Sequence, residues 1–211
     1  LVGMNGAGKS TFFKALMGFV RPSTGKIRLN GLRVNQAQKD QTVAYVPQNE
    51  GIDYAFPVSV WDVVMMGRYG AMNIFRIPRE SDRRAVVHAL ERVDLLDLRG
   101  RPIGSLSGGQ RKRAFLARAI AQRASVLLLD EPFAALDVMT IKMLQEIIVN
   151  LQVEEKITCL VTDHQAKSIL KITDSAMILN NGKIVAQDSP SNLIKDSGAI
   201  KSYFGDNFKI N

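Results

Sequence analysis

The stretch Gly3-Met4-Asn5-Gly6-Ala7-Gly8-Lys9-Ser10 decides the fold of this 211-residue chain. It fits the pattern G-x-x-x-x-G-K-[ST], in which glycines let a tight loop aim successive backbone N–H groups at phosphate oxygens. Apolar residues recur at helical spacing after the loop, so we expect a helix over residues 9–19 whose positive end adds to the anion site. A strand end at Val2, the loop and the helix together predict a phosphate-binding site. A glycine-rich turn without a ligand is the alternative.

Two side chains of the loop are suited to a nucleotide and its metal ion. Lys9 is placed to reach the β- and γ-phosphates, and the Ser10 hydroxyl to hold Mg²⁺. The other candidate contacts to the phosphates are the rest of the loop and the residue after it: Gly3, Met4, Asn5, Gly6, Ala7, Gly8 and Thr11.

Two carboxylates follow an apolar run further along the chain. Residues 126–129 read as a buried strand, and Asp130 and Glu131 come directly after them. Ligands of α/β sheets bind at the carboxyl ends of the strands, so Asp130 is placed to support Mg²⁺ and Glu131 to polarise an attacking water. An apolar run ending in Asp also occurs by chance, but beside a phosphate loop it indicates nucleotide hydrolysis.

A second glycine-rich segment, Leu106-Ser107-Gly108-Gly109-Gln110, precedes a helical pattern over residues 111–122. A hydroxyl and two glycines at the start of a helix offer another anion-binding surface. In isolation, a simple helix cap is the alternative explanation of this segment. Two phosphate-binding surfaces far apart in one chain make sense if the second serves the nucleotide of a partner subunit.

Strand and helix patterns alternate along the chain, apart from a helical stretch over residues 58–98. Such alternation predicts an α/β fold with a mostly parallel sheet covered on both faces. We expect a single domain over residues 1–211, with a core at 1–47 and 125–211 and a helical subdomain at about 48–124. The strands expected from the pattern lie at residues 26–29, 42–46, 125–129, 158–162, 176–179 and 183–186.

The composition argues against a membrane-spanning protein but does not identify the partner of this basic chain. The chain is 46% hydrophobic and 23% charged, as in ordinary globular proteins. No apolar run approaches the roughly 18 residues that span a bilayer, so we expect any work at a membrane to go through a partner. The net charge of +8 suits a nucleotide, an anionic membrane, nucleic acid or simply a basic surface, and composition does not choose among them.

The motifs, in their order along the chain, resemble those of ABC-transporter ATPases. The loop resembles their Walker A motif, residues 106–110 their signature motif and residues 127–131 their Walker B motif. Gln48 resembles their Q-loop glutamine, Asp137 their D-loop aspartate, and His164 in Thr162-Asp163-His164 their switch histidine. The resemblance implies a P-loop NTPase fold of the ABC type with a helical subdomain.

The resemblance also implies roles for individual residues in a Mg²⁺-dependent ATPase. Glu131 would be the general base, with Gln48 and His164 as further catalytic residues, and Ser10, Gln48 and Asp130 would surround Mg²⁺. Two copies would dimerise, each ATP lying between the Walker A of one copy and the signature of the other. The residues implied to complete the partner's site are Ser107, Gly108, Gly109 and Gln110, and Asp137, also implied to be a nucleotide-binding residue, would couple the two sites. Without the resemblance, Asp137 and His164 read as helix caps and Gln48 as a loop residue.

The two ends of the chain resemble different branches of this family. Residues 1 to about 137 resemble manganese, iron and zinc importer ATPases, and residues about 141 to 211 resemble lipopolysaccharide-export ATPases. In the family, the groove for the membrane subunit lies in the part that is importer-like here. We therefore expect import of a divalent metal, with lipopolysaccharide export as the alternative.

The implied partners are integral-membrane permease subunits and an extracytoplasmic solute-binding protein, with no nucleic acid. The expected location is peripheral, on the cytoplasmic face of the inner membrane. Family members also carry N-terminal strands, with an aromatic residue that stacks on adenine, and we expect these to be missing from this sequence. A soluble ABC ATPase without a transport role and an inactive nucleotide-binding module are therefore alternatives of another class.

Overall fold

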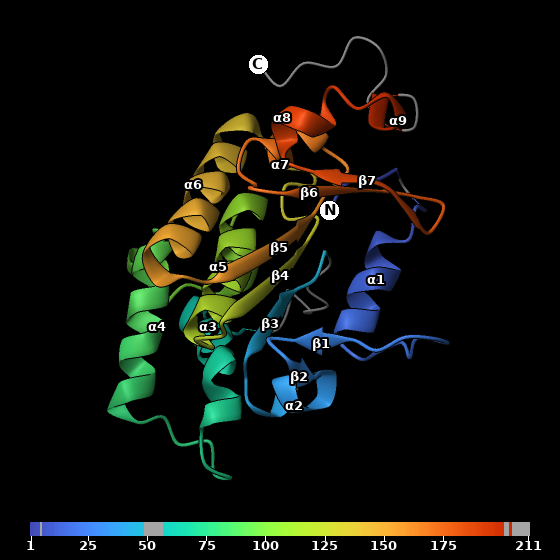
Figure 1. The fold of residues 1–211 in the computed structure, drawn as a ribbon. Coiled ribbons are helices and arrows are strands. Elements are labelled where there is room, and N and C mark those ends of the chain that lie inside the picture. The colour runs from blue at the N-terminus through green and yellow to red at the C-terminus, as the bar shows by residue number, and fades with distance from the viewer. Residues whose placement is uncertain (5, 49–56, 201–202, 204–211) are drawn as a thin grey trace.

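A parallel three-stranded sheet lies at the centre of the molecule (Figure 1). In this computed structural model, which describes residues 1–4, 6–48, 57–200 and 203, the strand order is β3-β4-β5. The strands are β3 (Val43–Val46), β4 (Val126–Asp130) and β5 (Thr158–Thr162). Every residue of β4 is buried, as expected for a middle strand covered on both faces. The carboxyl ends of all three strands therefore meet at one edge.

The residues before the phosphate loop join this sheet to a hairpin. Val2 bridges in parallel to Asp163, just after β5, and to Ile178 of β6. β6 (Ala176–Asn180) pairs antiparallel with β7 (Lys183–Asp188). The strand end expected at Val2 is present as this pair of bridges, which fixes the start of the loop beside the ends of the parallel strands.

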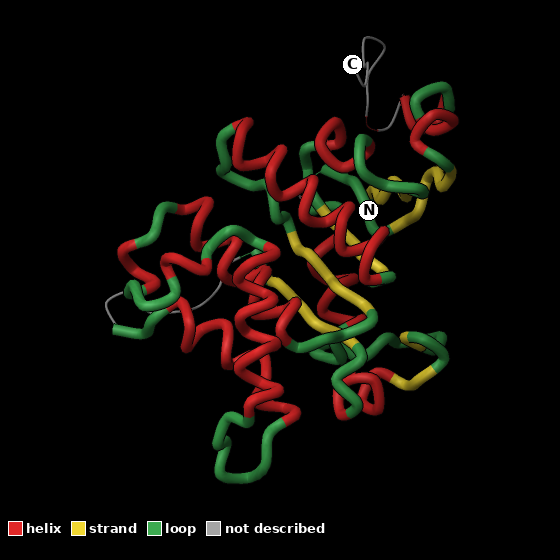
Figure 2. The backbone as a smooth tube through the Cα atoms, turned by 90° about the vertical axis from the view of Figure 1, so that its left-hand side faces the viewer, coloured by secondary structure: helices red, strands yellow, loops and turns green. Residues whose placement is uncertain are grey.

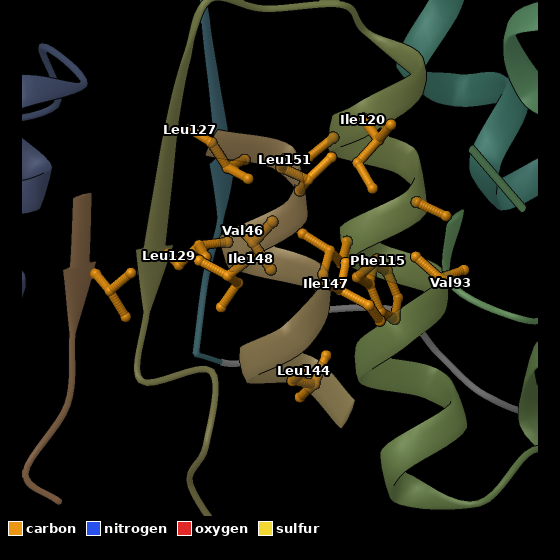
Figure 3. Packing of buried hydrophobic residues seen from close by; sticks show 14 of the residues in the cluster. Val46, Val93, Phe115, Ile120, Leu127, Leu129, Leu144, Ile147, Ile148 and Leu151 are labelled. Atoms are coloured by element: carbon orange, nitrogen blue, oxygen red, sulfur yellow. The ribbon is translucent and has the colours of Figure 1, made fainter. Parts of the chain in front are cut away.

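Alternate residues of β4 pack on opposite faces of the sheet. Leu127 and Leu129 belong to a core shared with α5 (Gly108–Ala121) and α6 (Val138–Glu155), as Figure 3 shows. Leu128 belongs to a second cluster, with residues of α1 (Lys9–Leu16), β1 (Arg28–Leu29) and α2 (Val34–Lys39). The buried strand therefore holds the helices on both faces in register with the sheet.

A group of helices lies to one side of the sheet in Figures 1 and 2. Its main members, α3, α4 and α5, share one hydrophobic core. Helices α2, α8 and α9 and strand β2 were not expected from the sequence, whereas β1 lies within the strand expected at residues 26–29. The remaining elements are β1 (Arg28–Leu29), β2 (Leu32–Arg33), α2 (Val34–Lys39), α3 (Val60–Met65), η1 (Met66–Ala71), α4 (Glu80–Arg92), η2 (Leu96–Leu98), η3 (Ile103–Ser105), α7 (Ala166–Leu170), α8 (Pro190–Leu193) and α9 (Ser197–Ala199).

Two helix boundaries differ from the expected ones because of local chemistry. Helix α1 ends at Leu16 rather than at residue 19, since Gly18 takes a φ of 71° and donates its N–H to Ala15 O. Helix α5 begins at Gly108 rather than at residue 111. There the Ser107 side chain accepts from Gln110 N while the Gln110 side chain accepts from Ser107 N.

A buried ion pair ties the helices of this group together. Arg68 Nε lies 3.0 Å from Asp82 Oδ1, and Arg68 Nη1 donates to Ala121 O at 2.9 Å. Burial raises the pKa of Asp82, but hydrogen bonds from Arg79 N and Arg68 outweigh it and hold this pKa below its usual value. The fold therefore needs the ionised carboxylate.

We predict that Asp82→Asn lowers the free energy of unfolding by about 3 kcal/mol at neutral pH, because Arg68 is left as an unpaired buried charge. Urea denaturation measures the loss. Because the folded-state pKa of Asp82 is the lower one, its contribution is present above the unfolded-state pKa and disappears as pH falls through the folded-state pKa.

Asp94→Asn is the matched control. The Asp94 side chain is 87% exposed and lies 3.6 Å from Arg113, so its ion pair contributes less than about 1 kcal/mol. Equal losses of unfolding free energy in the two variants would contradict the assignment of the Arg68–Asp82 pair.

Candidate functional site

The phosphate loop leads directly from Val2 into α1. Gly8, the residue that precedes α1, has a φ of 105°, a conformation that favours glycine. No side chain caps α1, and no acidic residue occupies its first turn. The N–H groups of a first turn have no acceptor within the helix, so they suit phosphate oxygens. Asn5, a further predicted contact, lies outside the described residues.

Lys9 is the centre of the loop's polar contacts. Its side chain is buried, and its Nζ donates to Gly3 O at 2.9 Å and to Met4 O at 3.2 Å. The same Nζ lies 3.7 Å from Glu131 Oε1. The lysine predicted to hold phosphate and the carboxylate predicted to act as base therefore meet, although they are far apart in the sequence.

Glu131 also brings together the other two predicted catalytic residues. Its Oε2 accepts a hydrogen bond from Gln48 Nε2 at 2.9 Å and lies 3.4 Å from His164 Nδ1. The Glu131 backbone has a φ of 49°, and its N–H donates to Thr162 O at 2.8 Å. This bond to β5 fixes the turn, in which residue Glu131 is 8% exposed.

Asp130 faces two hydroxyl donors at the sheet edge. Thr162 Oγ1 donates to its Oδ1 at 2.7 Å and Tyr45 Oη to its Oδ2 at 3.2 Å. Burial of Tyr45, followed by the nearby Asp130 carboxylate, raises the pKa of this phenol to about 12. Tyr45 therefore stays protonated at neutral pH, and Asp130 keeps both donors.

The predicted magnesium ligands have suitable chemistry. Ser10, Gln48 and Asp130 offer a hydroxyl, an amide oxygen and a carboxylate, all oxygen donors of the kind Mg²⁺ prefers. Among the described residues, no cluster of three or more His, Cys, Asp or Glu side chains could hold a metal.

The second glycine-rich segment lies against the start of α6. A Cβ on Gly109 would come within 2.7 Å of Thr140 Cγ2, so only glycine fits this contact. Thr140 is held by Asp137, whose Oδ1 accepts from Thr140 N at 2.9 Å and whose Oδ2 accepts from Thr140 Oγ1 at 2.6 Å. Asp137 thus caps α6. Ser107 and Gly108 are exposed beside it, and a role for Asp137 in coupling two sites stays a prediction.

Helix α5 also reaches the predicted catalytic residues around Glu131. Lys112 Nζ, one turn after the glycine-rich segment, donates to Gln48 O at 2.9 Å. The segment over residues 106–110 is therefore connected to Glu131 through Lys112 and Gln48.

With this geometry established, comparisons with known proteins identify the family. A sequence profile described as ABC transporter matches residues 1–134. The chain belongs to the ABC transporter family. It carries that family's ATPase domain. The predicted Walker A lysine, Lys9, and the predicted Walker B glutamate, Glu131, both lie within the matched residues.

Two relatives are metal transport proteins. The manganese transport system ATP-binding protein MntA of Synechocystis is 54% identical over 187 residues, which cover 89% of this chain and 71% of MntA. The chelated iron transport system membrane protein YfeB of Yersinia pestis is 50% identical, covering 88% of this chain and 62% of YfeB. This chain therefore spans about two thirds of the length of these relatives.

Solved structures give the same fold. A protein described as a metal-chelate type ABC transporter, in an inward-facing conformation, superimposes with a TM-score of 0.85 at 32% identity, covering 96% of this chain and 77% of that one. A part of the transporter complex cbiONQ, cbiO1 from Clostridium perfringens, gives 0.79 at 29% identity, covering 95% and 80%.

Asp163 is a residue of this ABC ATPase site that the sequence analysis missed. It is fully buried, and its Oδ2 accepts from Phe133 N at 3.0 Å while its Oδ1 accepts from Gln165 N at 2.9 Å. The same Oδ1 lies 3.3 Å from His164 Nδ1. Asp163 therefore joins the turn after Glu131 to the turn that carries His164. A charged residue directly after a buried strand was the available signal.

We predict that Asp163→Asn lowers kcat for ATP hydrolysis by roughly tenfold to a hundredfold, because an amide cannot accept both backbone N–H groups and the catalytic turns shift. The KM for ATP should change little, since Lys9 and the loop are untouched. Steady-state kinetics separate the two constants. Asp174→Asn, at an exposed position, is the control, and a raised KM with unchanged kcat in Asp163→Asn would contradict this role.

Proposed function

We propose that this ABC ATPase energises the import of a divalent metal ion, with manganese as the first candidate. The observation that carries the proposal is the 54% identity to the manganese transport protein MntA over 89% of the chain. The iron-system relative YfeB, at 50% identity, supports the same class of substrate. The metal ion itself would be bound by membrane subunits rather than by this chain.

In the proposed mechanism, Lys9 and the amides of the loop over residues 3–11 hold the phosphates of ATP. Glu131 accepts the proton of the attacking water, and Gln48 and His164, which both approach its Oε2, orient it. Mg²⁺, held by Ser10, Gln48 and Asp130, would supply charge neutralisation on the phosphates. Arrival of ATP would replace the contacts that Lys9 makes with Gly3 O, Met4 O and Glu131.

We propose that two copies dimerise so that residues 107–110 of each complete the nucleotide site of the other. In support, Ser107 and Gly108 are exposed, although they begin a helix suited to anions. Val138 and Met139, at the start of the adjacent α6, are 69% and 73% exposed. Apolar side chains beside an exposed helix N-terminus fit a surface that a second copy covers.

The proposed complex includes integral-membrane permease subunits and an extracytoplasmic solute-binding protein. Among the described residues, no helix combines the length and the apolar character needed to cross a membrane. We therefore propose a peripheral position on the cytoplasmic face of the inner membrane, where the permease would hold the dimer.

Lipopolysaccharide export is the second candidate. It rests on the expected resemblance of residues from about 141 onward to export ATPases, with the order Thr162-Asp163-His164 as part of that expectation. The match to MntA spans 187 residues and therefore also takes in part of this C-terminal region. Metal import remains the stronger proposal.

We predict that this chain restores manganese uptake to Synechocystis cells that lack MntA, because 54% identity should preserve the contacts with the manganese permease. Uptake of radiolabelled manganese is the measurement. Glu131→Gln, which removes the proposed base, is the matched control and should give no uptake at equal expression.

Manganese import would be contradicted if the unaltered chain gave no uptake although it hydrolysed ATP and was found in the membrane fraction of the cells. Restored growth of cells lacking a lipopolysaccharide-export ATPase would then support the second candidate.

A further inference from the structure

The loop between η1 and α4 carries a cluster of exposed apolar side chains. Ile74, Phe75 and Ile77 are 91%, 78% and 62% exposed, and the first two are the most exposed large hydrophobic residues in the described part of the chain. Figures 1 and 2 both show this loop projecting beyond the helices that it joins. We call residues 72–79 the apolar tip. A projecting apolar cluster of this kind indicates a binding surface.

Basic side chains surround the apolar tip. The exposed arginines here are Arg76 and Arg79 of the tip and Arg83 and Arg84 in the first turns of α4. Glu80 is the one exposed acidic residue from 72 to 84, all of which are described. Asp82 is buried against Arg68 and adds no negative charge to the surface. The surface therefore combines apolar residues with an excess of positive charge.

Local contacts give the apolar tip a defined shape. Arg76 N donates to Asn73 O at 2.9 Å, which closes a turn around Ile74 and Phe75. Arg76 has a φ of 50°, and its guanidinium lies 5.0 Å from the centre of the Tyr69 ring in η1. The turn and the cation–π contact hold the two apolar side chains outward, where they make few contacts with the protein.

We propose that the apolar tip is a membrane contact, in which Ile74, Phe75 and Ile77 enter the headgroup region of an anionic lipid surface. Apolar side chains together with neighbouring arginines are the chemistry that binds such a surface, since arginine pairs with lipid phosphates while the apolar groups leave water. This contact goes beyond the proposed function, because it needs neither the permease nor ATP. It would orient the domain against the bilayer.

The chemistry favours lipid over a protein partner. Four exposed arginines against one exposed acidic residue, Glu80, give this surface a net positive charge that complements an anionic bilayer. Basic residues near an anionic membrane each strengthen binding by about fivefold, and salt weakens the effect. Neutral lipid should therefore bind the chain much less than anionic lipid.

Sedimentation of the full chain with vesicles tests the proposal. We expect binding to vesicles of phosphatidylcholine and phosphatidylglycerol in equal parts, little binding to phosphatidylcholine alone, and a loss of binding at high salt. The double variant Ile74→Ser with Phe75→Ser should reduce the partition coefficient about tenfold or more. Val153→Ser with Ile184→Ser changes two side chains of 53% and 57% exposure elsewhere and should leave it unchanged.

Equal binding by the tip variant and the control, or no binding to anionic vesicles, would overturn the proposal. Loss of binding to the permease in lipid-free detergent by the tip variant, with vesicle binding intact, would make the tip a protein contact instead. ATP hydrolysis by the tip variant should equal that of the unaltered chain. Vesicle binding therefore tests the membrane contact, whereas ATP hydrolysis and metal uptake test the proposed transport function.

Discussion

The parallel pairing of β4 with β3 and β5 is the constraint on which the site depends. Because the three strands end at one edge, the residues that follow them must meet there. Asp130 and Glu131 end or follow β4, Gln48 follows β3, and His164 follows β5. Val2, bridged to the residue after β5, brings the phosphate loop to the same edge. One buried strand thus gathers four separate stretches of sequence.

The cluster at this edge holds its charges in pairs. Lys9 and Glu131 lie 3.7 Å apart within a largely buried environment, and Gln48 and His164 satisfy the other oxygen of Glu131. Such pairing matters because an unpaired buried charge is costly. In the proposed mechanism, the same arrangement would leave Glu131, the proposed base, ready for a water molecule once phosphate contacts Lys9. The segment at Ser107 remains outside this cluster, on an exposed surface, as expected if it serves another copy.

Much of this arrangement could be predicted from the sequence. The G-x-x-x-x-G-K-S loop placed α1, and apolar runs placed β4 and β5, because these signals are local. The end of α1 at Leu16 depends on the φ of Gly18, and the start of α5 on reciprocal bonds between Ser107 and Gln110. Such details follow from backbone geometry and side-chain hydrogen bonding, which periodicity does not report.

The long-range contacts could not be predicted from the sequence for a different reason. The hydrogen bonds of Asp163 to Phe133 N and Gln165 N exist only once β4 and β5 are aligned. The capping of α6 by Asp137 was expected as an alternative, and the structure has it, with Gly109 packed against Thr140. The roles of these residues in coupling two copies stay predictions.

The central claim is that each nucleotide site is shared between two copies of the chain. The most direct measurement is the mass of Glu131→Gln in solution with Mg²⁺ and ATP, by analytical ultracentrifugation. The account predicts that this variant binds ATP without turnover and sediments as a dimer only when ATP is present. Adding Ser107→Arg should remove the dimer while ATP binding remains. The shared site would be contradicted if the dimer persisted after Ser107→Arg was added. It would also be contradicted if Glu131→Gln bound ATP and stayed monomeric.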